Sequence, residues 1–439
     1  MSWNNHPVLL AATLALAPLA GGCGSSPQTP CNAAHFSAST YSQVGSWVAG
    51  NNTMTVTVNG NLCDPSHQYP NQPCTSVTVC SPSNPSNCQT VNNILLDTGS
   101  YGLRIFASSL TVPLTPITHD GQNLAECVQF GDGSSEWGQV QYAYIQLGNE
   151  PKIAAPILVI NSSYATPPPA CSSSQSYPDI NESQTGFNGI LGVGLWTQDC
   201  GSDCVSDAKN GQYFTCNGTD CSCGATADLG AQVQNPVALL PTDNNGVGLT
   251  LPSIASAGSP SLTGSLTLGI QTQSNNHPSG TTLYTVNGSG QMTTTFTPYS
   301  SSAIPSFLDS GSNGLFFPNP TDTPLPDCGG NYAGAFCPNT TQIYTATNTS
   351  HTGGRSGSVS FRVGKASTLL SQCNAAGGGG GGGAGNCVFD HYGANELYGT
   401  SGSSSASFDW GLPFFINRTT WVGIDGKTSI LGTGPYWAY

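Results

Sequence analysis

A thirteen-residue pattern occurs twice in this chain of 439 residues, and it limits the fold more than any other feature. Ile94 to Phe106 reads ILLDTGSYGLRIF, and Ser306 to Pro318 reads SFLDSGSNGLFFP. Each copy runs from apolar residues into Asp, then Thr or Ser, Gly and Ser, which is typical of a strand that ends in a tight turn. Two copies separated by about half the chain predict two lobes related by duplication.

The composition predicts a body built mainly from β-strands. Only 7% of the residues are charged, so the helix-forming residues Lys, Glu and Arg are scarce, and the chain contains 55 glycines. Alternating or β-branched segments are expected to be strands, among them Met54 to Val58, Val140 to Leu147 and Ser265 to Leu268. A chain of 439 residues also exceeds what one hydrophobic core usually organises, which again favours two lobes.

Asp97 and Asp309 occupy the same position in the two copies of the pattern. Two carboxyl groups that lie close together cannot both ionise at low cost, so such a pair keeps one proton and offers an acid and a base at once. The ionised partner can take a proton from an attacking water while the protonated partner donates to a substrate carbonyl. The alternative interpretation is that both aspartates cap turns at strand ends. The agreement between the copies favours the catalytic interpretation.

The DTGS sequence that starts at Asp97 and the DSGS sequence that starts at Asp309 resemble the two active-site loops of the pepsin-like aspartic peptidases. The resemblance implies an all-β, bilobal acid protease fold, with two related β-barrel-like lobes and an active-site cleft between them. It also implies aspartic-type endopeptidase activity, strongest in acid, with Asp97 and Asp309 as the catalytic pair and with no cofactor or metal. The supporting residues implied by the resemblance are Thr98, Gly99, Ser100, Ser310, Gly311 and Ser312.

Three further segments resemble landmarks of the same family and follow in the family's order. FNGILGVG in residues 187–194 and FDWG in residues 408–411 are similar to the segments that pack behind the two catalytic loops. The packing residues implied in this way are Ile190, Leu191 and Gly192 in the first lobe, with Asp409, Trp410 and Gly411 as their counterparts in the second. GSLTLG in residues 264–269 resembles the opening of a second lobe. The resemblance therefore implies an N-terminal lobe in residues 45–263 and a C-terminal lobe in residues 264–439.

The segment VQFGDGSSEWG, residues 128–138, resembles the hairpin flap that closes over substrate in this family. The flap residues expected to contact substrate are Phe130, Gly131, Asp132 and Gly133. The family usually has tyrosine where this chain has Phe130, and a phenyl ring cannot donate the hydroxyl hydrogen bond of tyrosine. Tyr142 or Tyr144 would supply a hydroxyl if the alignment were shifted. The departure keeps a second hypothesis open, a noncatalytic pepsin-fold lipoprotein that binds a peptide, a protein or a glycan.

The start of the chain has the features of an export signal. Val8 to Ala20 is an apolar run whose length is typical of a signal peptide rather than of a membrane span. The following LAGGC resembles a bacterial lipobox, which implies lipidation of Cys23. We expect a signal peptide in residues 1–23 and a flexible tether in residues 24–44. The expected location is the cell envelope, as a lipoprotein in the periplasm or at the cell surface, or outside the cell as a secreted protein.

The cysteines fit the same location. The chain contains 17 cysteines, and an even number remains when Cys23 is set aside for lipid. Such a density in an oxidising compartment is typical of structural disulfides, although the sequence does not reveal which cysteines pair. Zinc is the alternative for five of them, namely Cys200, Cys204, Cys216, Cys221 and Cys223. Their irregular spacing lacks the paired CxxC motifs of common structural zinc sites, so disulfides are favoured.

The charge balance limits the kinds of partner. The formal net charge of −14 repels phosphate backbones and anionic lipid, so nucleic acid is not expected as a partner and membrane contact is expected only through the lipid. The sequence contains no GxSxG or HExxH motif, which disfavours a serine hydrolase or a zinc hydrolase. We expect a monomer whose partner is a peptide or protein substrate.

Overall fold

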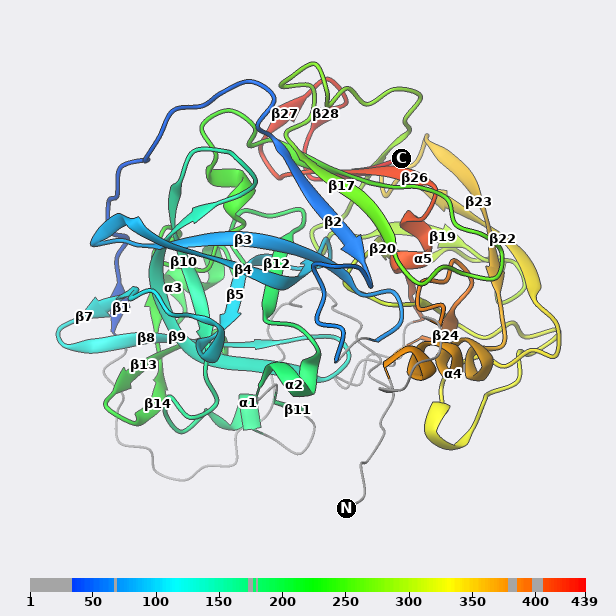
Figure 1. Ribbon diagram of the computed structural model, residues 1–439, viewed down its shortest axis with the longest axis horizontal. Coiled ribbons are helices and arrows are strands. Elements are labelled where there is room, and N and C mark those ends of the chain that lie inside the picture. The colour runs from blue at the N-terminus through cyan, green and yellow to red at the C-terminus, as the bar shows by residue number, and fades with distance from the viewer. Residues whose placement is uncertain (1–33, 67–68, 173–176, 179–180, 378–384, 397–405) are drawn as a thin grey trace.

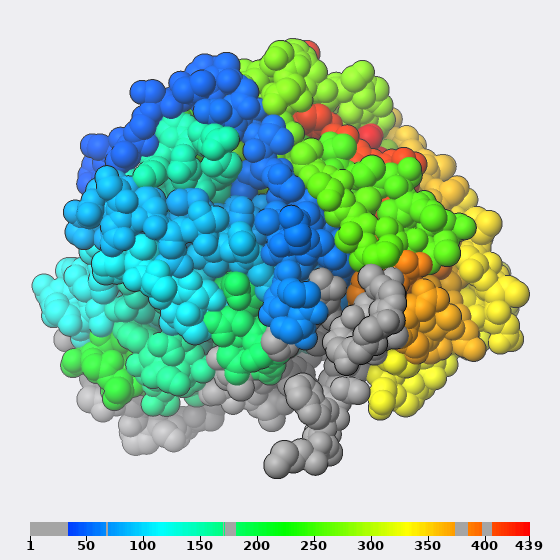
Figure 2. Space-filling view, in the orientation of Figure 1, coloured from blue at the N-terminus to red at the C-terminus, as the bar shows by residue number. Residues whose placement is uncertain are grey.

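The computed structural model describes residues 34–66, 69–172, 177–178, 181–377, 385–396 and 406–439. Strands dominate the described residues, and only one helix reaches 12 residues. The N-terminal half of the chain lies on one side and the C-terminal half on the other, with β2 and β17 between them (Figure 1). The space-filling view shows the same division, blue and cyan on the left and yellow and orange on the right (Figure 2). The predicted all-β, bilobal fold is confirmed.

One sheet connects the two lobes. Its strands in spatial order are β3 (Pro73–Ser81), β2 (Thr53–Val58), β17 (Leu262–Leu268), β16 (Gly246–Leu251), β26 (Arg418–Gly423), β29 (Tyr436–Ala438) and β18 (Leu283–Thr285). In β2 the sequence alternates, so that Thr53 and Thr55 are exposed while Met54 and Val56 are buried in the core. The predicted boundary between residues 263 and 264 falls inside β17, within the strands that both halves share.

The N-terminal lobe holds the first copy of the repeated pattern. Its strands are β4 (Asn84–Asp97), β5 (Tyr101–Phe106), β6 (Thr115–Pro116), β7 (Thr118–His119), β8 (Gln122–Gln129), β9 (Ser134–Gln146), β10 (Ile153–Ile160), β11 (Tyr177–Pro178), β12 (Gly189–Val193), β13 (Tyr213–Asn217) and β14 (Asp220–Gly224), with the pair β1 (His35–Phe36) and β15 (Thr226–Ala227). The predicted strand from Val140 to Leu147 forms the end of the longer β9.

The C-terminal lobe holds the second copy in a seven-stranded sheet. Its strands in spatial order are β23 (Ser356–Val363), β22 (Gln342–Thr349), β19 (Met292–Thr295), β20 (Ile304–Leu308), β25 (Phe408–Trp410), β21 (Leu315–Phe317) and β24 (Gly393–Asn395). A small hairpin of β27 (Thr428–Ser429) and β28 (Gly432–Thr433) follows near the C-terminus.

Both lobes contain the same arrangement of three strands. β12 lies between β4 and β5, parallel to β4 and antiparallel to β5, and places Gly192 opposite Asp97. β25 lies between β20 and β21 in the same two senses, and places Trp410 opposite Leu308 and Leu315. In each lobe a distant segment of the chain therefore closes the space behind the strand and turn of the repeated pattern.

The helices are short and lie outside this arrangement. They are α1 (Pro169–Ser172), α2 (Glu182–Thr185), α3 (Ser202–Ser206), α4 (Ala366–Gly377) and α5 (Leu412–Phe415), with 3-10 turns at Ala107–Ser109, Pro236–Leu239 and Gly330–Tyr332. Among the residues described, no helix has the length and apolar character needed to cross a bilayer. The predicted signal peptide with Cys23, residues 24–33 of the predicted tether, and the glycine run after Gly377 lie outside the described residues.

Seven disulfides join described cysteines. They are Cys63–Cys74, Cys80–Cys88, Cys127–Cys171, Cys200–Cys204, Cys216–Cys221, Cys328–Cys337 and Cys373–Cys387. Cys223 is also disulfide-bonded. The zinc alternative for these cysteines is therefore wrong, because a sulfur committed to a disulfide is no thiolate ligand. This density of disulfides is typical of an exported protein.

Candidate active site

The two copies of the repeated pattern meet at the junction of the lobes. The Thr98 backbone N–H donates to Ser310 Oγ at 3.1 Å, and the Ser310 backbone N–H donates to Thr98 Oγ1 at 2.9 Å. Each hydroxyl in turn donates across the junction, Thr98 Oγ1 to the Leu308 carbonyl at 3.0 Å and Ser310 Oγ to the Leu96 carbonyl at 2.8 Å. Only a hydroxyl accepts and donates in this way at such a short reach, which explains Thr or Ser at this position of both copies.

This junction brings Asp97 and Asp309 together. Both side chains are fully buried, and each carboxyl group perturbs the pKa of the other. Each carboxyl also receives local hydrogen bonds from its own loop. Asp97 accepts hydrogen bonds from the Gly99 N–H at 2.7 Å and from the Ser100 hydroxyl. Asp309 accepts hydrogen bonds from the Gly311 N–H at 2.8 Å, the Ser312 N–H at 3.2 Å and the Ser312 hydroxyl at 3.0 Å. The arrangement is nearly symmetric, as the repeated sequence predicts.

The electrostatics of the pair are less symmetric. Burial raises the pKa of Asp97, while the hydrogen bonds from Ser100, Asp309 and Gly99 lower it in part. Burial raises the pKa of Asp309 well above its ordinary value, and the neighbouring carboxyls of Asp97 and Asp409 raise it further. Because burial opposes ionisation of both carboxyls, the pair retains a proton that the two groups share. The pair has the acid and the base that hydrolysis of an amide requires.

The segments predicted to pack behind the two loops are β12 and β25 with the residue that follows β25. Ile190, Leu191 and Gly192 are buried in β12, directly beside β4 and β5. A Cβ atom added at Gly192 would lie 2.5 Å from the Tyr101 backbone nitrogen, and one added at Gly411 would lie 2.0 Å from the Gly314 carbonyl oxygen. Both contacts are with backbone atoms that cannot turn aside, so glycine is the residue that fits.

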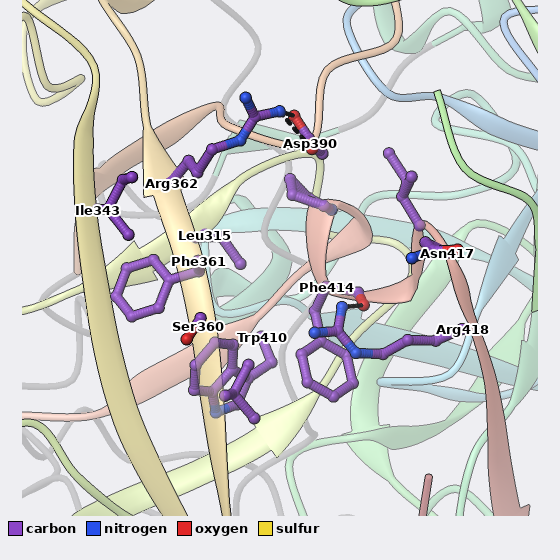
Figure 3. Close-up of a pocket in the computed structure, with 13 residues that line it drawn as sticks. Leu315, Ile343, Ser360, Phe361, Arg362, Asp390, Trp410, Phe414, Asn417 and Arg418 are labelled. Atoms are coloured by element: carbon purple, nitrogen blue, oxygen red, sulfur yellow. Dashed lines mark hydrogen bonds and ion pairs between the residues drawn. The ribbon is translucent and has the colours of Figure 1, made fainter. Parts of the chain in front are cut away.

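Trp410 has a different surrounding from its counterpart Leu191. Its indole N–H donates to Thr294 and Asn348 inside the C-terminal lobe, and its ring lines a pocket of about 370 Å³ together with Phe361 and Phe414 (Figure 3). The paired carboxyls are not among the residues that line this pocket. Trp410 is therefore a packing residue of the C-terminal lobe, buried between β20 and β21.

The predicted flap is a hairpin, formed by β8 and β9 with Phe130 to Gly133 at its turn. Gly133 has a φ of +88°, which explains the glycine, and its N–H donates to the Phe130 carbonyl at 3.0 Å. Phe130 is buried in an apolar cluster of the N-terminal lobe. Burial raises the pKa of Asp132 to about 6. The turn thus carries an apolar side chain that packs into the lobe and a carboxyl group with a raised pKa.

The two tyrosines that could have replaced the missing flap hydroxyl are engaged elsewhere. Tyr142 Oη accepts the Ser39 N–H at 2.7 Å and donates to the Gly230 carbonyl at 3.2 Å. Tyr144 Oη donates to the Ser42 carbonyl at 2.8 Å. Both hydroxyls therefore hold the segment that precedes β2. Another phenol, that of Tyr101, interacts electrostatically with the paired carboxyls. Burial raises the pKa of Tyr101 well above its ordinary value, and Asp97 and Asp309 raise it further.

Asp409 is the site residue whose importance sequence reasoning missed. It is buried in β25, and its Oδ2 lies 2.5 Å from Ser312 Oγ, the same hydroxyl that contacts Asp309. The signal was present in the sequence, because Asp409 occupies the position of Ile190 when FDWG is compared with GILG. A carboxyl in place of a buried apolar residue is costly unless it is paired or protonated, and so points to a specific role.

A second missed feature is a buried ionic cluster around Arg104. Arg104 stands in the repeated pattern where the second copy has Phe316. Its Nη2 lies 2.9 Å from Asp199 Oδ2 and 3.2 Å from Glu126 Oε1, and its Nε lies 3.8 Å from Glu136 Oε2. All four side chains are almost completely buried. Because Arg104 lies in β5, Glu126 in β8 and Glu136 in β9, the cluster joins the first catalytic loop to the flap hairpin.

The cluster makes stability depend on pH through Glu136. Burial raises the pKa of Glu136 from 4.5 to about 8, so its proton stabilises the folded chain fully below pH 4.5 and this contribution is lost as the pH rises toward 8. We expect Glu136→Gln, which cannot ionise, to lower the steepness of this loss by roughly 1.4 kcal/mol per pH unit. Urea unfolding at several pH values between 5 and 8 measures it. Equal slopes for the variant and the wild type would contradict the assignment.

Within the described ranges, no group of three or more His, Cys, Asp or Glu side chains has the geometry to hold a metal ion. The reactive groups that the structure places at the junction of the lobes are the carboxyls and hydroxyls of the two loops.

The family of the chain follows from comparison with known sequences. A family model described as "Protein of unknown function (DUF3443)" matches residues 48–439, which include both copies of the pattern and the flap hairpin. The chain belongs to this family. No curated protein matches the sequence. The DUF3443 description states no activity, so the function of this member has to be inferred from its own site.

One solved structure shares a limited likeness with this DUF3443 protein. It is an aspartic proteinase from Irpex lacteus, with 16% sequence identity and a TM-score of 0.45. The match covers 88% of this chain and 96% of the proteinase.

Proposed function

We propose that this protein is an aspartic-type endopeptidase that hydrolyses peptide bonds with a water activated between Asp97 and Asp309. The observation that carries the proposal is the pairing of two fully buried carboxyls on equivalent loops, each of which perturbs the pKa of the other. The reciprocal bonds of Thr98 and Ser310 hold the two loops in place beneath them. Such a costly arrangement of two acids is expected where the chemistry needs a shared proton.

The proposed reaction assigns different tasks to the two carboxyls. Asp97 takes a proton from the attacking water, whose oxygen bonds to the scissile carbonyl carbon. Asp309 donates its proton to the carbonyl oxygen and so neutralises the developing charge. When the intermediate collapses, the carbon–nitrogen bond breaks, the leaving nitrogen receives the proton held by Asp97, and Asp309 recovers its own. The hydroxyls of Ser100 and Ser312 orient the carboxyl oxygens during these transfers.

The proposal is tested by incubating the full chain with a mixed peptide library from pH 3 to 8. We expect cleavage with a bell-shaped pH profile, because activity requires Asp97 ionised and Asp309 protonated. The raised pKa of Asp309 extends the active form from acid toward neutral pH. The double variant Asp97→Asn/Asp309→Asn serves as the blank. A folded wild-type protein that cleaves nothing across this range would overturn the proposal.

A second candidate function is binding without catalysis, on the same scaffold. Phe130 favours it, because the buried phenyl ring at the turn of the flap offers no hydroxyl to a substrate. The occupant would be a peptide, a protein or a glycan. A tight complex that survives in the Asp97→Asn/Asp309→Asn variant, combined with no cleavage by the wild type, would support this function instead.

We further propose that the protein acts in the cell envelope as a monomer on peptide or protein substrates, with no nucleic-acid partner. The disulfides support export, and the LAGGC sequence supports lipidation of Cys23 as the only membrane contact. The variant Cys23→Ser is expected to leave the membrane fraction for the soluble fraction when cells are fractionated. A wild-type protein already entirely soluble would rule out the lipid.

A further inference from the structure

A third carboxyl lies next to the catalytic pair. Asp409 belongs to β25, and its neighbours across the sheet are Phe307 in β20 and Phe316 in β21. These two strands contain no charged residue, so the titratable groups that face Asp409 are Asp309 and Asp97. Within the described part of the chain, Asp409 Oδ2 has Ser312 Oγ as its hydrogen-bond partner, and Asp409 Oδ1 has none.

The number of hydrogens around Ser312 is limited. Ser312 Oγ lies 2.5 Å from Asp409 Oδ2 and 3.0 Å from Asp309 Oδ2, and both distances are hydrogen bonds. A serine hydroxyl has one hydrogen to donate, whereas an ionised carboxylate only accepts. The hydroxyl can therefore donate to one of the two carboxyls, and the other must donate a proton of its own to the Ser312 oxygen.

The surroundings decide which carboxyl donates. Asp309 Oδ1 accepts two backbone hydrogen bonds, from the N–H groups of Gly311 and Ser312. These bonds leave Asp309 Oδ2 as an acceptor for the Ser312 hydroxyl. No described backbone N–H reaches Asp409, and a buried carboxyl without such donors favours its neutral form. The proton between Asp409 and Ser312 therefore resides on Asp409.

We propose that Asp409 is a positioning residue of this site, a protonated carboxyl that donates to Ser312 and thereby directs the Ser312 hydroxyl onto Asp309. The inference rests on the proposed peptidase function for its effect on turnover, although the proton on Asp409 does not depend on catalysis. When Asp409 loses its proton at higher pH, the Ser312 hydroxyl turns toward the new carboxylate. Asp309 then loses a hydrogen bond and gains a negative neighbour, so Asp409 also limits activity at the alkaline end.

The kinetic test compares an isosteric amide with an apolar residue. The amide side chain of the variant Asp409→Asn retains a donor for Ser312, whereas the side chain in Asp409→Leu has none. We expect Asp409→Leu to lower kcat at acid pH by roughly ten- to a hundredfold with little change in KM, since the Ser312 oxygen loses its donor and the Ser312 hydroxyl is no longer held toward Asp309. Asp409→Asn should lose less than about threefold, and its activity should persist to higher pH because the amide does not ionise.

A double variant shows whether Asp409 acts through Ser312. In a Ser312→Ala background the acceptor is already absent, so adding Asp409→Leu should lower kcat by less than about twofold. Equal losses for Asp409→Asn and Asp409→Leu in the wild-type background, or full additivity with Ser312→Ala, would overturn the proposal.

Infrared spectroscopy of the full chain tests the proton itself, without any activity. The difference spectrum of wild type minus Asp409→Asn at neutral pH should contain the carbonyl stretch of a protonated carboxylic acid. Carboxylate bands in its place would show that Asp409 is ionised and would refute the inference. If the wild type cleaves no peptide while the carboxylic acid band is present, the peptidase function fails and the assignment of the proton stands.

Discussion

Asp97→Asn is expected to lower the rate of peptide hydrolysis by at least about a thousandfold, with Asp309→Asn having a comparable effect. An amide in place of Asp97 cannot take a proton from water. The local hydrogen bonds survive the change, because the Gly99 N–H still finds a carbonyl oxygen and the Ser100 hydroxyl can turn to accept from the new NH₂ group. The loss is therefore chemical rather than structural. Initial rates on the best peptide from the library, across the pH range, measure it.

Stability provides the internal control for this prediction. The pKa of Asp97 is raised in the folded chain, so its ionised form at neutral pH costs folding free energy that the amide does not. The variant should therefore unfold at the same or a higher urea concentration than the wild type at pH 7. Asp322→Asn changes an exposed carboxyl in the C-terminal lobe. It should alter neither the rate of peptide hydrolysis nor the urea concentration at which the chain unfolds. Turnover by Asp97→Asn within tenfold of the wild type would exclude the proposed role of the pair.

Arg104→Met is expected to destabilise the folded chain by about 3–5 kcal/mol at neutral pH. The methionine side chain fills much of the same space, but it removes the cation that faces Glu126, Glu136 and Asp199 in a fully buried cluster. Burial already raises the pKa of Asp199 well above its ordinary value even with Arg104 present. Without the guanidinium, any of these carboxyls that is ionised must take up a proton or remain charged in a poorly solvated interior. Urea unfolding near pH 7 measures the loss.

The pH dependence of the stability loss, and a control variant at an exposed arginine, make the prediction for Arg104→Met specific. The loss should be smaller near pH 5, where the buried carboxyls acquire protons more readily. Arg355→Met removes an exposed guanidinium and should change the free energy of unfolding by less than about 0.5 kcal/mol. If Arg104→Met costs no more than this control, the cluster contributes nothing to stability.

Much of the candidate site was predictable because its parts are local in sequence. A strand that enters a DTGS or DSGS turn positions a carboxyl, a glycine N–H and a serine hydroxyl within four residues, and the structure shows these contacts at both loops. The repeat also predicted that the loops form a pair, since each needs the hydroxyl of the other. The glycines at 192 and 411 were predictable for a similar reason, as part of a repeated segment.

Other features required contacts between distant segments. The sequence contained Arg104 and Asp409 at positions where the other copy of each motif has an apolar residue, yet nothing nearby in the chain identified their partners. Glu126, Glu136 and Asp199 reach Arg104 from two strands and a loop, and the interaction between Asp409 and Ser312 spans 97 residues. The pairing of the cysteines was equally open, because a pairing is decided by which sulfurs the fold brings within bonding distance.

From the sequence alone, one could infer two β-rich lobes, a pair of aspartates on equivalent turns, and an export signal with many cysteines. Periodicity, turn residues and a repeat are sufficient for these conclusions because each is a property of a short segment. Only the tertiary structure decided the protonation of the site. The pKa of Asp309 depends on burial and on Asp97 and Asp409, carboxyl groups contributed by segments from both lobes. An electrostatic environment is a sum over neighbours in space, and a linear sequence does not say which neighbours these are.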